Sequence, residues 1–92
     1  MPNIFSTLGY HIYFWSNEND EPIHVHVSKG RPNAHATKFW LTKSGGCVLA
    51  SNGSNLSSHD INKLIDVITA QYDLICESWL KYFNAKQIQF YI

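Results

Sequence analysis

Cysteine is scarce in this sequence of 92 residues. Its two cysteines, Cys47 and Cys76, stand far apart and form no Cys-x-x-Cys pair. Disulfide frameworks and cysteine zinc sites need larger sets of cysteines at regular spacings, so neither is expected here. Both residues are predicted to be buried thiols in a reducing cytoplasm.

Net charge is also missing, because seven basic residues balance seven acidic ones. A formal charge of zero counts against a general nucleic-acid binder, which attracts phosphates non-specifically. The charges are unevenly placed, however. Between residues 22 and 59 every charged residue is basic: Lys29, Arg31, Lys38 and Lys43. A local basic patch is therefore still open.

Long apolar runs are absent as well. No segment approaches the roughly 20 apolar residues of a membrane span, and the first residues lack the basic start of a signal peptide. The chain is nevertheless 45% hydrophobic and 14% aromatic, which is well above disordered composition. It is expected to be one cytoplasmic domain over residues 1–92, without a membrane contact.

Strand signals dominate the first half of the chain. Segments 10–16, 23–28 and 34–42 contain many aromatic or β-branched residues, and segment 47–51 is a short apolar run. Polar turns containing glycine, proline or asparagine separate the four segments. The second and third segments are predicted to form a hairpin. Together the four segments predict an antiparallel meander of about four strands.

Helical periodicity dominates the second half. Apolar residues recur every three or four positions from Ile61 to Phe83, and Ser57 to Asp60 has the spacing of a capping box. Asn84 is a suitable terminator. One long helix or two consecutive ones fit, and the tail 86–92 alternates as either a last strand or a frayed end. The predicted fold class is α+β, with the meander packed against the helical segment.

Strand alternation divides the meander into two faces. One is apolar and is expected to face the helix. The other collects rings, imidazoles and an ammonium group if the strands align in register, and it could bind something anionic and flat. Its members are His11, Tyr13, Trp15, His24, His26, Lys38 and Trp40.

The pair His24 and His26 admits several interpretations. Ordinary surface or hydrogen-bonded strand histidines are the simplest. General acid–base chemistry is open, with Lys38 stabilising negative charge. A metal half-site would need a third ligand, and His11, Asp20, Glu21 and His35 stand at no diagnostic spacing, so no metal or other cofactor is predicted.

The remaining candidates suggest binding rather than catalysis. Trp15, Trp40 and Tyr13 could stack bases or a partner's side chains, although packing is the commoner role of an aromatic residue. Lys29 and Arg31 at the hairpin tip are either a solvated turn or a contact for phosphate or a partner.

Several segments resemble a small bacterial family catalogued as domain of unknown function 4160. They are MPNIF, GYHIYFWSNE, EPIHVHVSKG, AHATKFWL and the helix end ESWLKYF. The most specific element is the acidic loop with proline and HVHV, followed by the strand around Lys38. Ile23 stands where the family usually has a second proline, and Thr37 where alanine is commoner.

The resemblance implies a short cytoplasmic protein encoded beside another small protein, as in type II toxin–antitoxin pairs. It suggests the toxin half, with an adjacent-gene antitoxin as partner and RNA or the ribosome as a target. Among single residues, the resemblance points to His24, His26 and Lys38 as functional candidates, and more weakly to Trp40 and Trp79. We therefore expect a toxin acting through the histidines and Lys38. The alternatives are a non-catalytic binding module or a metal-binding protein, and leftover apolar surface would also permit a homo-oligomer.

Overall fold

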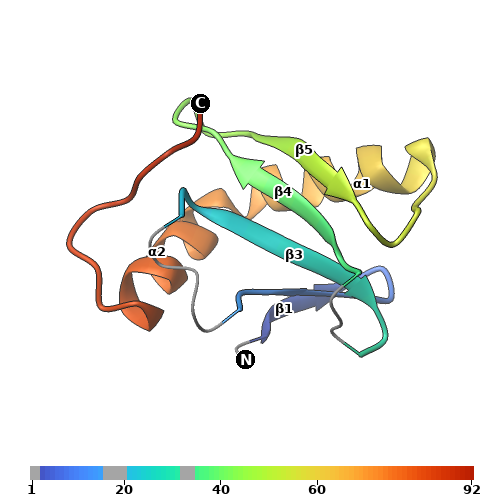
Figure 1. Ribbon diagram of the computed structural model, residues 1–92, viewed down its shortest axis with the longest axis horizontal. Coiled ribbons are helices and arrows are strands. Elements are labelled where there is room, and N and C mark those ends of the chain that lie inside the picture. The colour runs from blue at the N-terminus through green and yellow to red at the C-terminus, as the bar shows by residue number, and fades with distance from the viewer. Residues whose placement is uncertain (1–2, 16–20, 32–34) are drawn as a thin grey trace.

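The computed structural model describes residues 3–15, 21–31 and 35–92. They form a five-stranded antiparallel sheet followed by two helices, which confirms the α+β class (Figure 1). The strands lie side by side in chain order, as expected for a meander. Their bounds are β1 Asn3–Thr7, β2 Tyr10–Tyr13, β3 His24–Lys29, β4 Thr37–Leu41 and β5 Cys47–Asn52.

Strand β1 corrects the prediction of about four strands. It pairs with β2 through a two-residue turn in which Leu8 and Gly9 both have positive φ angles, 54° and 82°. Such turns favour asparagine, aspartate or glycine at the first position, where this chain has leucine. Of the two turn residues, only Gly9 therefore matches the residue types that usually mark such a hairpin in a sequence.

The other four strands lie where they were expected, with shorter bounds for two of them. β2 ends at Tyr13 rather than at residue 16, and β4 begins at Thr37 rather than at residue 34. Residues 16 and 34 themselves lie outside the described residues. The hairpin of β3 and β4 is confirmed, with Val25 opposite Phe39.

The helical segment consists of two helices, α1 (Ser58–Ala70) and α2 (Tyr72–Tyr82). The predicted cap is present, because the Ser57 hydroxyl accepts a hydrogen bond from the backbone N–H of Asp60. Gln71 breaks the helix, with φ −104° and ψ 19°, and no proline or glycine marks this position. In the described part of the chain, neither helix has the length and apolar content to cross a membrane.

Asn84 ends α2 as predicted. It has a positive φ of 51°, and its N–H donates to the carbonyl of Lys81 while the N–H of Ala85 donates to that of Leu80. This pair of bonds is a Schellman motif, which satisfies the last carbonyls of a helix.

The carboxy-terminal tail returns to the sheet without forming a strand. The N–H of Ile23 donates to the carbonyl of Gln89 at 2.9 Å, and the N–H of Lys43 donates to that of Ile92 at 3.0 Å. Figure 1 shows the tail curving from α2 to the turn between β4 and β5. The tail is therefore held at two points rather than paired along its length.

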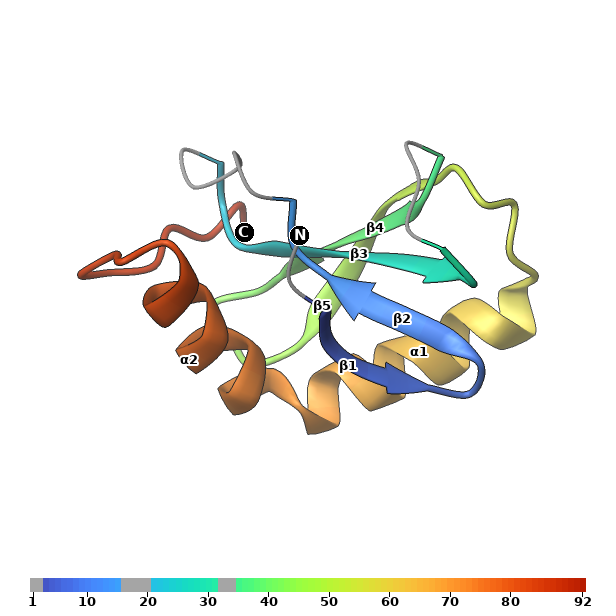
Figure 2. The ribbon, with the colours of Figure 1, turned by 90° about the horizontal axis from the view of Figure 1, so that it is seen from below.

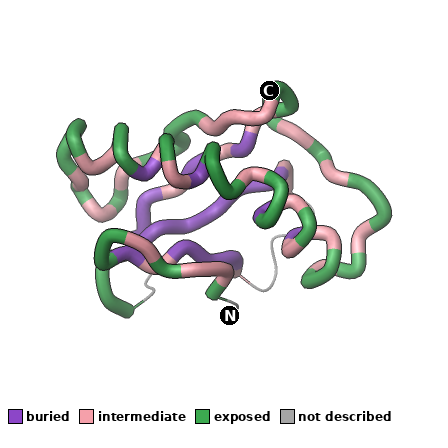
Figure 3. The backbone as a smooth tube through the Cα atoms, turned by 180° about the vertical axis from the view of Figure 1, so that it is seen from behind, coloured by how far each residue is buried: buried purple, intermediate pink, exposed green. Residues whose placement is uncertain are grey.

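The hydrophobic core lies between the sheet and the helices, which both lie on the same side of it (Figure 2). We call the sheet surface turned toward them the helix face. As predicted, it carries alternate strand residues, which pack with Leu64, Ile68, Ile75 and Trp79. Figure 3 shows the middle strands largely buried behind helices whose outer turns are exposed. The strand residues of this core include Tyr10, Ile12, Val25, Val27, Phe39 and Leu41.

Candidate functional site

The strand registers bring most of the predicted site residues together. Tyr13 of β2 lies opposite His26 of β3, which lies opposite Lys38 of β4. In the next row His24 lies opposite Trp40. Because paired residues of adjacent strands project to the same side, these five residues share the surface away from the core, which we call the ring face.

The rings of this face form a continuous chain of contacts across three strands. Centroids of successive rings lie 4.9 to 5.7 Å apart, within the range of aromatic pairs. His24 additionally contacts Trp79 of α2 at 5.4 Å, which connects the ring face to the helix layer. The order of the chain is Trp15, Tyr13, His26, His24, Trp40 and Tyr91.

The middle of this chain is buried. His24 and Tyr13 have no exposed surface, and His26 is 8% exposed. The Nδ1 of His24 lies 2.8 Å from the carbonyl oxygen of Pro22. A carbonyl can only accept, so Nδ1 carries the proton and donates it. The imidazole of His24 is thus held by a hydrogen bond and by three rings.

Lys38 is also engaged. Its Nζ lies 3.0 Å from Oε1 of Glu21 and 4.2 Å from the centroid of the Trp40 ring. The first contact is an ion pair and the second a cation–π interaction. Glu21, which was considered as a metal ligand, therefore balances the charge of the lysine that was expected to stabilise an anion.

Exposed surface is found at the Trp40 end of the chain. Tyr91 stacks on Trp40 with ring planes 11° apart and is itself 63% exposed. Val48 of β5 lies opposite Trp40 and is 39% exposed. We call Lys38, Trp40, Val48 and Tyr91 the docking patch. Local sequence patterns did not indicate Tyr91 or Val48 as site residues, because the course of the tail and the register of β5 bring them there.

Other predicted residues lie outside the docking patch. Trp15 is half-buried at the far end of the ring chain, against Tyr13 and His26. The Nδ1 of His11 lies 2.9 Å from the hydroxyl of Ser6 in the neighbouring strand β1. Within residues 3–15, 21–31 and 35–92, no three His, Cys, Asp or Glu side chains form a group that could hold a metal ion. Asp20 lies outside the described residues.

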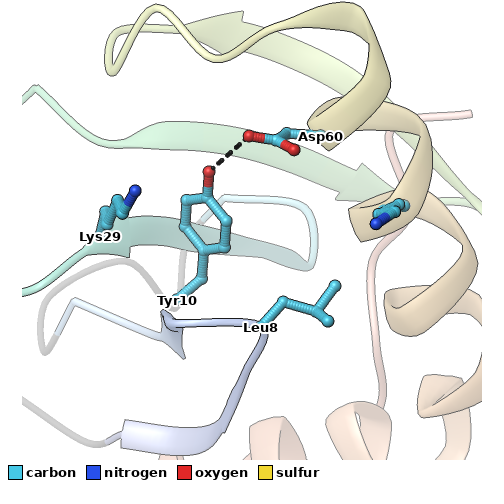
Figure 4. A pocket seen from close by; sticks show the side chains of 5 residues that line it. Leu8, Tyr10, Lys29 and Asp60 are labelled. Carbon is cyan, nitrogen blue, oxygen red and sulfur yellow. Dashed lines mark hydrogen bonds between the residues drawn. The ribbon is translucent and has the colours of Figure 1, made fainter.

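Lys29 lies on the opposite face from the histidine pair, because it alternates with Val25 and Val27 at the end of β3. It lines a cavity of about 280 Å³ together with four residues: Leu8, Tyr10, Asp60 and Lys63 (Figure 4). Arg31 is exposed beyond the strand. The two basic residues predicted at one hairpin tip therefore occupy different settings.

A hydrogen bond joins two of the residues that line this cavity. The hydroxyl of Tyr10, a residue only 6% exposed, donates to Oδ2 of Asp60 at 2.9 Å (Figure 4). Burial and the neighbouring Asp60 carboxylate raise the pKa of Tyr10. Sequence patterns could not pair these residues, because fifty positions separate them.

Both cysteines are free and only partly buried, which corrects the prediction of buried thiols. The Cys47 thiol approaches the carbonyl of Ile65 and the hydroxyl of Thr69. Burial is the main cause that raises the pKa of Cys47 and of Cys76. A raised pKa leaves less thiolate at neutral pH, so the structure offers no activated nucleophile at these positions.

Fold and ring face define a small α+β protein with a histidine pair in the central strand of its sheet. Residues 9–80 match the family described as Domain of unknown function (DUF4160), and the chain belongs to this family. The match spans β2 to β5, α1 and most of α2. It therefore includes all the rings that contact one another across the ring face, except that of Tyr91. No curated protein and no solved structure gives a significant match.

Proposed function

We propose that the protein is the toxin half of a bacterial two-protein module and that it acts by docking on another macromolecule. The two-gene arrangement implied by the family resemblance supports the toxin assignment. The enclosure of His24 supports docking over catalysis. A general acid or base must come within hydrogen-bond reach of its substrate, and a side chain without exposed surface does not offer that reach.

The ion pair of Lys38 supports the same choice. Stabilising a developing negative charge calls for a cation directed at the reacting atoms. The Lys38 ammonium is instead 3.0 Å from a carboxylate and lies over the Trp40 ring. Its contribution is better suited to holding the indole in place than to meeting a substrate.

The docking patch provides the contact surface in this proposal. Tryptophan and tyrosine are enriched among the residues that dominate binding energy. The rings of Trp40 and Tyr91 are stacked, with Trp40 half-buried and Tyr91 exposed. β5 lies beside them as an edge strand with no charged residue. An edge strand presents backbone donors and acceptors to which a partner strand can pair. The antitoxin would cover this patch and so block the toxin's target, for which RNA or the ribosome is our proposal.

The test is bacterial growth during induced expression of the native chain and of folded variants. Val48→Lys and Tyr91→Ala change exposed residues of the docking patch, and both should relieve growth arrest. Leu74→Lys is the matched control, because Leu74 of α2 is 41% exposed but lies outside the patch. It should arrest growth like the native chain.

The histidines are tested in the same assay with His24→Asn combined with His26→Gln, or with His26→Gln alone if the double variant does not fold. Both replacements keep hydrogen-bonding groups but remove acid–base chemistry near neutral pH. If the protein acts by docking, these histidine variants should still arrest bacterial growth. Loss of arrest in a folded histidine variant would favour catalysis, and no arrest by the native chain would contradict the toxin assignment.

A further inference from the structure

We propose that the cavity between Lys29 and Lys63 binds the phosphate group of a small phosphorylated molecule. This site is separate from the docking patch and does not depend on the proposed function. The cavity lies where the turn after β1, the start of β2, the end of β3 and the first turns of α1 meet. Its volume of about 280 Å³ is at the lower end for ligand pockets, which fits a small ligand.

The charge of the lining selects an anion. Lys29 and Lys63 come from different elements, are both exposed, and have no ion-pair partner among the residues that the structure describes. The lining contains these two ammonium groups and one carboxylate, that of Asp60. The lining therefore has an excess of positive charge, and Figure 4 shows Lys29 on one side of the Tyr10 ring and α1 on the other.

The hydrogen bond between Tyr10 and Asp60 organises the site. It ties the sheet to α1 and so fixes the strand that carries Lys29 relative to the helix that carries Lys63. It also occupies one carboxylate oxygen with a donor, which reduces the repulsion that Asp60 would exert on an anion. Leu8, which is 56% exposed, adds an apolar wall for the part of the ligand that carries no charge.

The experiment is an NMR titration of the isotope-labelled chain with ribose 5-phosphate, inorganic phosphate and a short single-stranded RNA. The amide signals of Leu8, Lys29 and Lys63 should shift and saturate with ribose 5-phosphate, and inorganic phosphate should compete. Saturation with RNA but not with ribose 5-phosphate would overturn the assignment to a small molecule. Saturation with inorganic phosphate alone would overturn it too.

Charge variants give the sharper test. Lys29→Gln and Lys63→Gln should each weaken binding about tenfold, since a charge-assisted hydrogen bond is lost. Lys86→Gln, in the exposed tail, is the matched control and should leave affinity unchanged. Asp60→Asn keeps an acceptor for the Tyr10 hydroxyl and removes the only negative charge of the lining, so it should tighten binding several-fold. Weaker binding by Asp60→Asn would show that the ligand needs the carboxylate, and would contradict an anion site.

Discussion

The two faces of the sheet are both buried at their centres, but by different chemistry. The helix face carries Ile12, Val25 and Phe39, which have no exposed surface and pack against apolar helix residues. The ring face carries Tyr13 and His24, which are equally buried but contact other rings and hydrogen-bonding groups. Burial alone therefore does not separate a core face from a candidate site.

The difference lies in what each face requires of its residues. Aliphatic contacts are non-directional, so the helix face depends mainly on volume. The ring face depends on direction, because the imidazole of His24 donates to one particular carbonyl and meets its neighbours nearly edge to face. A histidine pair can thus be fixed in a strand for structural reasons.

The largest effect is expected on the helix face. Phe39→Ala should lower the free energy of unfolding by about 3–5 kcal/mol, because a fully buried ring is replaced by a cavity. Urea denaturation measures the change, with Val48→Ala on the exposed edge as control. A loss below about 1 kcal/mol would mean that the sheet and helices pack less closely than described.

A smaller effect should distinguish the two faces directly. His24→Leu keeps an apolar volume but leaves the carbonyl of Pro22 without its donor, which should cost about 1–3 kcal/mol. Leu41→Met on the helix face conserves volume without losing a hydrogen bond, so it should cost less than about 1.5 kcal/mol. If His24→Leu lowered the free energy of unfolding no more than Leu41→Met does, the two faces would not differ in their dependence on direction.

The third effect is confined to alkaline pH. The folded-state pKa of Tyr10 is raised above its ordinary value of 10.0, so the folded state holds its proton more tightly than the unfolded state. This contribution to stability is fully present below pH 10 and is lost as the pH rises through the folded-state pKa. Urea denaturation across this range should show a shallower decline for Tyr10→Phe than for the native chain. An identical decline would indicate that the pKa of Tyr10 is not raised by folding.

Local patterns in the sequence predicted the fold class, the two faces and both ends of the helical segment. Alternation placed Val25 and His24 on opposite faces, and the Ser57 cap and the Asn84 terminator lie where their residue types indicated. These features depend on residues that are close together along the chain, so the composition and spacing of the sequence are enough to predict them.

Features that depend on tertiary contacts escaped prediction. Strand β1 was missed because Leu8 adopts a conformation that leucine seldom takes. Two consecutive helices were left open as one alternative, but no proline or glycine marks the break at Gln71. The pairing of Lys38 with Glu21 joins residues from separate segments, as does that of Tyr10 with Asp60. Burial of the histidine pair could not be foreseen either, because alternation places a side chain on a face without showing what covers it.

The imidazole of His24 has no exposed surface, and its chemical reactivity in the folded chain can be measured. The folded chain would be treated with diethyl pyrocarbonate, which acylates accessible imidazoles, and each histidine followed by mass spectrometry. His59, exposed in the first turn of α1, is the internal control. We predict that His59 is modified rapidly and that His24 reacts only when the chain is unfolded. Modification of His24 at the rate of His59 in the folded chain would show that the His24 imidazole is accessible, and general acid–base catalysis would again be open to the histidine pair.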